Sequence, residues 1–476
     1  MADYDPAEGM HTARCPGPGW TEILAADTIA PPAFMAQDHY RYLGSEPIDA
    51  ARYYDPAFHR AEVEKMWPHV WQFATREEDL PEPGDYVTYD NAGRSYLIVR
   101  QEDGAIKAFH NVCLHRGRKL KTDSGSADQF VCPFHGFAWN TDGGLRGIPC
   151  RWDFAHLTDA KMQLPEASVA RWGGYVFVRD AADGPTIEEY LSPLPDYFKR
   201  WRHEDCVTVA WVGKVVKANW KITMEAFMES YHAYVTHPQL MPFTGDANAA
   251  YHVLGEHVNV NYTPFGTISP HLEAQAAREG WPQQRIIDEF VKYNGRSADN
   301  YDPEKDNFNI AVPEGDSARV ALGRAMRATS ARTFGGDYSG VSESELLDAL
   351  VFNVFPNFAP WGGFMPNIVY RWRPWPDQDA CLMEVRVLAR VAEGQPRPHG
   401  VPFHLLGADE CWADAPELGV LGAVVDQDMS NMELTHEGLK VSKNQAVELG
   451  DYQEVRIRHF HQTLDHYLAN KEHADD

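Results

Sequence analysis

The chain has 476 residues, of which 44% are hydrophobic and 12% aromatic, and its formal net charge is −26. This length predicts two domains of a globular protein, and the negative charge argues against a nucleic acid or an anionic membrane as partner. The sequence has no apolar run that could span a bilayer, no signal peptide at its start, and seven scattered cysteines without a disulfide pattern. We therefore expect a cytoplasmic protein.

The first part of the chain, residues 1–81, reads as an N-terminal arm followed by a helix. Residues 1–45 are rich in Pro, Gly and Ala and lack periodicity, which predicts an extended arm. Asp55 followed by Pro56 is typical of a helix start, with an N-cap side chain and proline at the first helical position. The expected buried face of this helix follows at helical spacing: Val63, Met66, Trp67 and Val70.

A small all-β domain is predicted over residues 82–182. The hydrophobic period changes to two, with strands at 86–89, 95–100 and 105–109, a hairpin turn at 139–144 and a closing strand at 174–179. Residues 183–195 then read as a linker.

Two mixed Cys/His pairs lie within this β unit, Cys113-x-His115 and Cys132-x-x-His135. Two cysteines and two histidines can hold either a zinc ion or a [2Fe–2S] cluster in which the histidines bind one iron. A zinc finger usually brings Cys with Cys in one pair and His with His in the other. The mixed pairs therefore favour the cluster, and a zinc site is the alternative.

The remaining residues, 183–476, predict a larger domain with an antiparallel sheet covered by helices, so the fold class is α+β. We expect a strand at 206–213, a helix from Ala218 to about Tyr234, strands within 351–387, and helices at about 415–439 and 451–469. The polar stretch 266–345 is a possible insertion, and it holds either helices or a lid. Aromatic residues in the strands are more often core than pocket: Phe352, Phe355, Phe358, Trp361 and Phe364.

His232 and His237 form a second candidate metal pair, which is weak by itself. Positions five apart on an ideal helix point about 140° apart, so the two imidazoles converge only if the helix distorts or ends between them. Pro238, which cannot continue a helix, favours such an ending. The alternative is two histidines with ordinary hydrogen-bond partners near a helix end.

Both regions resemble one family. The segments Asn-x-Cys-x-His-Arg-Gly and Cys-Pro-Phe-His-Gly-Phe-x-Trp resemble the Rieske iron–sulfur motif. The run from Ala218-Asn-Trp-Lys through Glu229 to His237-Pro238 resembles the mononuclear-iron helix of Rieske non-haem iron oxygenases, in the large (alpha, catalytic) subunit of the aromatic-ring-hydroxylating oxygenases. It departs from the family pattern at Ala226, where asparagine is often seen.

The resemblance implies roles for particular residues. Its first motif implies a Rieske [2Fe–2S] cluster on Cys113, His115, Cys132 and His135. Its second implies a mononuclear Fe(II) on His232, His237 and a carboxylate from a downstream helix, for which Asp428 matches the ligand position.

Two acidic residues complete what the resemblance implies. Asp426 is the alternative carboxylate, but it is two positions from Asp428 and would point to another side of a helix. Glu229 would be a catalytic residue: it would accept a hydrogen bond from an iron-bound imidazole and link this iron to the Rieske histidine of a neighbouring subunit.

The implied function is the oxygenase component of a multicomponent system. It would use O2 and electrons that originate in NAD(P)H to hydroxylate an aromatic or other bulky apolar compound. The chain has no dinucleotide-binding fingerprint, so the electrons would arrive from a separate reductase or ferredoxin. The family implies a homotrimer, possibly with a small beta subunit. The motifs do not distinguish dioxygenation from monooxygenation or O-/N-demethylation, and the alternative outside this class is a zinc-stabilised binding protein.

Overall fold

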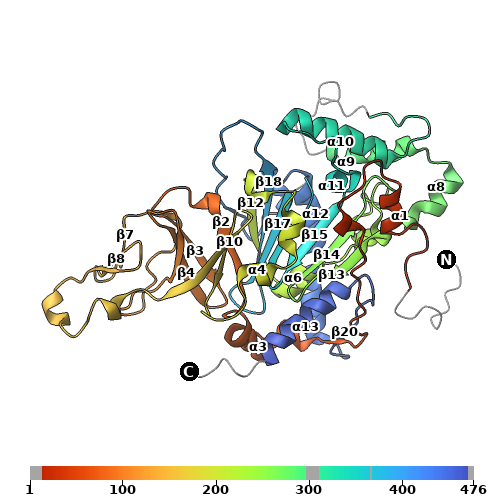
Figure 1. Ribbon diagram of the computed structural model, residues 1–476. Helices are drawn as coiled ribbons and strands as arrows, with labels where there is room; N and C mark the ends of the chain where they lie inside the picture. The colour runs from red at the N-terminus through yellow and green to blue at the C-terminus, as the bar shows by residue number, and fades with distance from the viewer. Residues whose placement is uncertain (1–12, 296–309, 365–366, 470–476) are drawn as a thin grey trace.

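Two sheets organise the part of the chain that the computed structural model describes, residues 13–295, 310–364 and 367–469. In Figure 1 a seven-stranded sheet lies at the left in orange and yellow, and an eight-stranded sheet forms the body at the right. We call the first unit the β-domain and the second the larger domain. The predicted α+β class, with a small all-β domain beside an antiparallel sheet covered by helices, is confirmed.

The β-domain is an antiparallel sheet with a small three-stranded sheet at its outer end. Its order is β2-β11-β10-β5-β4-β3-β6, and β7-β8-β9 form the small sheet. The strands are β2 (Gln72–Arg76), β3 (Asp85–Asn91), β4 (Arg94–Arg100), β5 (Ile106–His110), β6 (Gly125–Ser126), β7 (Gln129–Val131), β8 (Ala138–Asn140), β9 (Leu145–Gly147), β10 (Glu166–Trp172) and β11 (Tyr175–Arg179).

This sheet begins earlier than predicted. Strand β2 precedes the expected boundary at residue 82, yet it pairs with β11. All five of its residues are buried, so the alternation that identifies a half-exposed strand is absent from its sequence. The assignment of these residues to the N-terminal arm was wrong for that reason.

The segment before the sheet is more ordered than an extended arm. Helix α1 (Trp20–Ala25) is followed by the 3₁₀ turn η1 (Ala33–Ala36), and Trp20 Nε1 donates to the Met35 carbonyl at 2.8 Å. Strand β1 (Ile48–Asp49) pairs with β20 (Ala446–Val447) near the other end of the chain. The part of the predicted arm before residue 13 lies outside the described residues.

The predicted N-terminal helix forms where its capping residues indicate. After the short helix α2 (Ala51–Tyr54), helix α3 (Pro56–Ala61) begins with Asp55 Oδ1 accepting from the Ala57 N–H at 2.7 Å. It continues as a π-helical turn, η2 (Glu62–Met66).

The larger domain is built on the strand order β13-β14-β15-β16-β17-β18-β12-β19. Neighbours are antiparallel except β12 and β19, which pair in parallel. The strands are β12 (Cys206–Val216), β13 (Ala250–Val253), β14 (Val258–Thr263), β15 (Ala349–Val354), β16 (Phe358–Pro360), β17 (Asn367–Pro374), β18 (Cys381–Arg390) and β19 (His404–Leu405).

Helices and 3₁₀ turns surround this sheet, and none of the described helices is long and apolar enough to cross a membrane. The main helices are α4 (Ile187–Leu191), α5 (Leu194–Phe198), α6 (Trp220–Glu225), α7 (Ala233–Thr236), α8 (Glu273–Glu279), α9 (Gln283–Gly295), α10 (Ala318–Phe334), α11 (Glu343–Leu347), α12 (Val420–Val441) and α13 (Val455–Ala469). The 3₁₀ turns are η3 (Glu77–Asp79), η4 (Arg151–Phe154), η5 (Ala160–Met162), η6 (His203–Asp205), η7 (Asp246–Asn248), η8 (Pro270–Leu272), η9 (Trp412–Asp414) and η10 (Pro416–Leu418).

One expectation for this domain needs correction. The stretch 183–195 is not a plain linker, because it contains α4 and the start of α5, whose apolar side chains are buried in the main core. The stretch 266–345 is largely helical where it is described: α9, α10 and α11 share a hydrophobic cluster with Phe243. Residues 296–309 of the proposed lid lie outside the described residues.

Charged side chains join the two domains. Arg76 of β2 donates to the carbonyls of His203 and Cys206 at 3.1 and 2.9 Å. Arg386 of β18 bonds to Asp79 Oδ2 at 2.7 Å. These buried contacts fix the β-domain against one end of the larger sheet, so its outer loops project away from the body (Figure 1).

A buried ion pair ties the N-terminal helix to α6. Lys221 Nζ lies 2.6 Å from Glu62 Oε1, and both side chains are completely buried. Breaking such a pair from one side leaves an uncompensated buried charge. We expect Lys221→Met to destabilise the fold by about 3–5 kcal/mol, seen as a lower thermal unfolding temperature at equal metal content.

Two variants control this measurement. Lys217→Met removes an exposed lysine that lies just before α6, with a side chain 74% exposed, and should leave the unfolding temperature nearly unchanged. Adding Glu62→Gln to Lys221→Met should recover part of the loss. Equal unfolding temperatures for both lysine variants would contradict the assigned role.

Candidate metal centres

The first candidate centre consists of two loops of the β-domain with the same backbone construction. The Gly117 N–H donates to the Cys113 carbonyl, and the Gly136 N–H donates to the Cys132 carbonyl, each at 2.9 Å. Both glycines have left-handed φ angles, 77° and 75°, which other residues adopt at a cost. Each loop is thus a tight turn that carries one Cys and one His.

The four side chains of these loops lie at graded depths. Cys113 and Cys132 are buried, His115 is half-buried and His135 is exposed. The centroids of the two imidazole rings lie 4.6 Å apart, and the His115 ring stacks on Phe137 at 4.5 Å. The loops therefore present two inner thiols and two outer imidazoles.

The residues present fit a [2Fe–2S] cluster. His115 Nδ1 is buried without a hydrogen-bond partner among the described residues, which suits a metal-ligating atom. Burial raises the pKa of the Cys113 thiol, N–H groups of His115 and Arg116 lower it, and the adjacent Cys132 thiol raises it. Such N–H contacts to sulfur are one means by which proteins tune a cluster.

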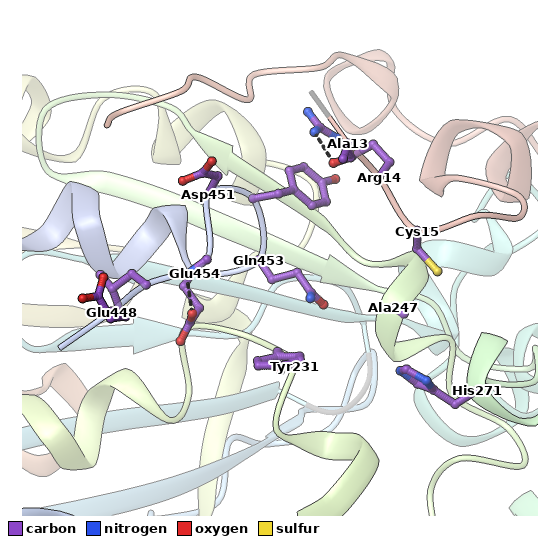
Figure 2. Close-up of a pocket in the computed structure, with 13 residues that line it drawn as sticks. Ala13, Arg14, Cys15, Tyr231, Ala247, His271, Glu448, Asp451, Gln453 and Glu454 are labelled. Carbon is purple, nitrogen blue, oxygen red and sulfur yellow. Dashed lines mark hydrogen bonds between the residues drawn. The ribbon is translucent and has the colours of Figure 1, made fainter. Parts of the chain in front are cut away.

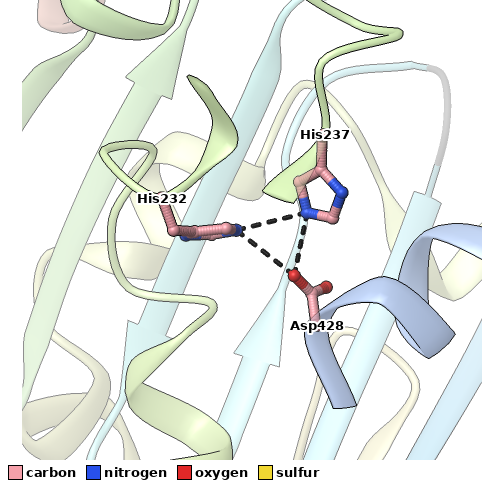
Figure 3. A group of neighbouring side chains, drawn as sticks. All are labelled: His232, His237 and Asp428. Atoms are coloured by element: carbon pink, nitrogen blue, oxygen red, sulfur yellow. Dashed lines mark hydrogen bonds and ion pairs between the residues drawn. The ribbon is translucent and has the colours of Figure 1, made fainter. Parts of the chain in front are cut away.

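The second candidate centre brings together His232, His237 and Asp428 (Figure 3). The two Nε2 atoms lie 3.3 Å apart. Asp428 Oδ1 lies 2.8 Å from His237 Nε2 and 3.3 Å from His232 Nε2. Three possible ligand atoms from distant parts of the chain therefore face one point.

The local fold explains why the two histidines converge. Helix α6 ends at Glu225 and the single turn α7 begins at Ala233, so His232 precedes α7 and His237 follows it. The expectation of one helix through about Tyr234 was wrong. Residues 226–232 are not helical. Helix α7 ends at Thr236, and His237 has non-helical angles of φ −124° and ψ 54°, so the helix ends between the two histidines, as Pro238 predicted.

The other nitrogen of each ring has an acceptor. His232 Nδ1 lies 2.7 Å from Glu229 Oε1, and His237 Nδ1 lies 2.9 Å from Gln427 Oε1. Gln427 Oε1 also accepts from Gln239 Nε2 at 2.6 Å, which identifies it as an acceptor. Nδ1 of each ring therefore donates to its acceptor, and each Nε2 faces the centre, where it would give its lone pair to a metal. Sequence reasoning missed Gln427; its position beside Asp428 was the available signal.

Helix α12 determines which aspartate faces the histidines. At Gly422 an added Cβ would lie 2.6 Å from the Trp412 carbonyl, so the helix packs directly on that backbone. Asp426, one turn later, accepts from the N–H groups of Trp412 and Ala413 at 2.9 Å each. Asp428 projects from another side and is buried beside the imidazoles.

The electrostatics of this centre favour a positive charge. Burial opposes the imidazolium form of His232, but Glu229 and Asp428 outweigh it and raise the His232 pKa to about 10. Burial likewise opposes the charged form of Asp428, yet hydrogen bonds from both histidines hold its pKa below the ordinary value. Two imidazoles and one carboxylate are the donor set of non-haem Fe(II) oxygenases, so these residues fit that metal.

Aromatic side chains lie beside this centre. The ring of Tyr370 lies 4.6 Å from Phe227, 5.6 Å from Trp372 and 6.4 Å from Trp361. Burial raises the Tyr370 pKa, and the nearby charge of Asp428 contributes. Three of the five aromatic residues singled out in the sequence are buried in the main core, as expected: Phe352, Phe355 and Phe358.

A surface pocket of about 790 Å³ is lined by Tyr231, the residue before His232 in the chain (Figure 2). Tyr231, which is 58% exposed, contributes one wall, and the rim carries Glu448, Asp451 and Glu454. Burial raises the Glu454 pKa to about 7, and the charge of Glu229 contributes to the shift. The pocket is therefore acidic and close to Glu229.

Comparison with known proteins identifies both domains. The family model of the Rieske [2Fe-2S] domain matches residues 70–158, and that of the ring hydroxylating alpha subunit (catalytic domain) matches residues 196–470. The glycine betaine monooxygenase oxygenase subunit of Chromohalobacter salexigens is 31% identical over 231 residues, 46% of this chain and 51% of that protein. The large oxygenase component of the naphthalene 1,2-dioxygenase system of a Ralstonia species is 34% identical over 191 residues, 38% of this chain and 43% of that protein. These matches thus span about half the length of the relatives.

Solved structures agree in fold. A quaternary ammonium Rieske monooxygenase superposes with a TM-score of 0.60 at 16% identity, covering 89% of this chain and 96% of that one. A naphthalene 1,2-dioxygenase superposes with a TM-score of 0.62 at 19% identity, covering 90% of this chain and 94% of that one. The alternative of a zinc-stabilised binding protein is excluded by the two family matches. Since the catalytic-domain model alone covers more than half of the 476 residues, the chain belongs to the alpha subunits of the Rieske ring-hydroxylating oxygenases.

Proposed function

We propose that this protein is the oxygenase component of a multicomponent Rieske oxygenase that hydroxylates an aromatic or other bulky apolar compound with O2. The observation that carries the proposal is the convergence of His232, His237 and Asp428 beside an aromatic wall. Electrons would come from NAD(P)H through a separate reductase or ferredoxin.

The cofactors would be held by the two sets of side chains described above. Cys113, Cys132, His115 and His135 would bind the [2Fe–2S] cluster, and His232, His237 and Asp428 would bind Fe(II). When bound, the cluster supplies single electrons, and the Fe(II) supplies open coordination positions for O2.

The protein side chains position these groups and handle protons. Glu229 Oε1 accepts a hydrogen bond from His232 Nδ1, with the two atoms 2.7 Å apart. This contact fixes the ring and raises its basicity. The Gln427 amide does the same for His237. The rings of Phe227, Tyr370 and Trp361 would contact an apolar substrate, since buried aromatic surface favours such contacts.

The placement of the two centres favours electron delivery between subunits. Strands β7 and β8, which the loop with Cys132 and His135 connects, lie at the left in Figure 1, whereas α6 and α12 lie in the body. One subunit therefore keeps its own two centres apart. A head-to-tail homotrimer, possibly with a small beta subunit, would bring the β-domain of one copy to the body of the next.

Surface chemistry supports this assembly. The outer end of the β-domain exposes Phe134 (54%) and Trp152 (80%), with the Arg116 guanidinium over the Phe134 ring at 5.1 Å. The pocket beside Glu229 has an acidic rim and exposed Tyr231. An apolar, basic end matches an apolar, acidic pocket, and Glu229 would then lie between the two metal centres.

A second candidate function is oxidation of a quaternary ammonium compound, including N-demethylation. It is favoured by similarity to the glycine betaine monooxygenase subunit. The aromatic rings beside Asp428 also suit it, since aromatic faces attract quaternary ammonium groups. Product analysis with an aromatic hydrocarbon and with glycine betaine, each with a reductase supplied, separates the two functions.

Metal analysis is the primary test of the proposal. Anaerobically purified protein should contain about three irons and two acid-labile sulfides per chain, the sum of a two-iron cluster and one mononuclear ion. Cys113→Ser should remove the sulfide and the Rieske-type paramagnetic signal. Cys150→Ser, at an exposed cysteine, should retain both. Stoichiometric zinc without sulfide would contradict the proposed cofactors.

The two aspartates of α12 provide a matched pair of variants. Asp428→Asn should lower affinity for the mononuclear iron by about tenfold or more, while the cluster stays intact. Asp426→Asn, which weakens only the contact to residues 412–413, should retain the iron. Chelator competition followed by iron and sulfide analysis measures both. Equal iron affinity in the two variants would mean that Asp428 is not a ligand.

Glu229→Gln tests the proposed link between the centres. The amide preserves size but removes the charge that accepts the His232 proton, so turnover should fall by about 10- to 100-fold. Cluster and iron contents should equal those of the unchanged protein. Glu279→Gln, at an exposed carboxylate on α8, should have no effect. Normal turnover in Glu229→Gln would refute the linking role.

A further inference from the structure

Within the non-helical residues 226–232 between α6 and α7, side chains replace both partners of one helical hydrogen bond. In an uninterrupted α-helix the His232 N–H would donate to the carbonyl of Met228, four residues earlier. Instead it donates to Glu229 Oε2 at 2.9 Å. The Met228 carbonyl accepts from Arg456 Nη1, also at 2.9 Å. The Glu229 carboxylate and the Arg456 guanidinium therefore replace the two halves of a single helical hydrogen bond.

Arg456 lies on α13 and is completely buried. Its other hydrogen bonds go to Asn259 Oδ1 at 2.7 Å, to the Val351 carbonyl at 2.9 Å and to Asn261 Oδ1. Across residues 13–295, 310–364 and 367–469, every oxygen that accepts from this guanidinium is uncharged. Burial lowers the Arg456 pKa, although a guanidinium stays charged near neutral pH.

This solvation by neutral groups differs from that of two other buried arginines, Arg371 and Arg319. Arg371 pairs with Glu384 Oε2 at 2.6 Å, and Arg319 pairs with Asp348 Oδ1 at 2.6 Å. A buried charge without a close counter-charge is costly. At Arg456 the charge is compensated by the neutral acceptors and by the charge of Glu229, which raises the Arg456 pKa against the larger effect of burial.

The same guanidinium also steadies the residue on the other side of Glu229. Asn261, which accepts from Arg456, donates from Nδ2 to Ser230 Oγ at 3.3 Å. The Ser230 N–H donates to the Tyr251 hydroxyl at 3.1 Å. Both chain neighbours of Glu229 are thus held, one directly by Arg456 and one through Asn261.

We infer that Arg456 is a positioning residue for the mononuclear metal centre. Because it donates to the Met228 carbonyl, Arg456 occupies the acceptor that the His232 N–H would have in a helix, and this N–H donates to the Glu229 carboxylate instead. The Glu229 carboxylate accepts hydrogen bonds from the backbone N–H and from Nδ1 of His232. The imidazole then faces His237 and Asp428. This inference rests on the proposed function, since it assigns the metal to that centre.

Iron affinity, measured by chelator competition, tests the inference without relying on activity. Arg456→Met should lower affinity for the mononuclear iron by about 10- to 100-fold, the usual effect of removing a group that orients a metal ligand. The visible absorbance of the cluster should be unchanged. Arg456→Lys can retain the contact to Met228 but not all the hydrogen bonds of the guanidinium. Its iron affinity should lie between those of Arg456→Met and the unchanged protein.

Arg458→Met is the matched control, because Arg458 is a buried arginine of the same helix that donates to the Glu46 carbonyl. It should leave iron affinity unchanged. The inference is overturned if Arg456→Met binds iron as the unchanged protein does, or if Arg458→Met weakens binding equally. If Arg456→Met fails to fold, Arg456→Lys is the deciding variant. Iron affinity equal to that of the unchanged protein would mean that Arg456 has a purely structural role, and so would loss of the cluster together with the iron. An unchanged protein that binds no mononuclear iron would instead refute the proposed function.

Discussion

The convergence of three possible metal ligands on one point is the constraint that the surrounding part of the larger domain meets. The Nε2 atoms of His232 and His237 lie 3.3 Å apart, and Asp428 adds a negative charge at the same point. Such an arrangement is unfavourable without a positive charge at its centre. The packed helix α12, the interrupted helix before His232 and the amide pair behind His237 hold the groups in place, so the site is preorganised for a cation.

Sequence patterns predicted the parts of this protein whose chemistry is local. The mixed spacing of Cys113 with His115 and Cys132 with His135 pointed to a cluster, and the alternating strands pointed to the sheet that carries it. The period of a helix also separated Asp428 from Asp426. Local spacing sufficed because a tight turn, or two positions on one helix, fixes relative directions without reference to the rest of the chain.

Features that depend on distant contacts could not be predicted in this way. Strand β2 has no alternation because both of its faces are buried. The backbone hydrogen bonding before His232 involves Arg456, more than two hundred residues later in the chain, through its hydrogen bond to Met228. Nothing near position 232 signals that contact. Gln427 likewise acquires its partner only when α12 packs against the turn that follows His237.

The partners behind the two histidines have a consequence for the metal that they would share. A carboxylate behind His232 draws its Nδ1 proton strongly, whereas the neutral amide behind His237 draws its proton weakly. The first ring therefore has partial imidazolate character and is the stronger electron donor. Two residues that look equivalent in the sequence would divide the coordination sphere unequally, with an electron-rich side next to the face proposed to receive a neighbouring subunit.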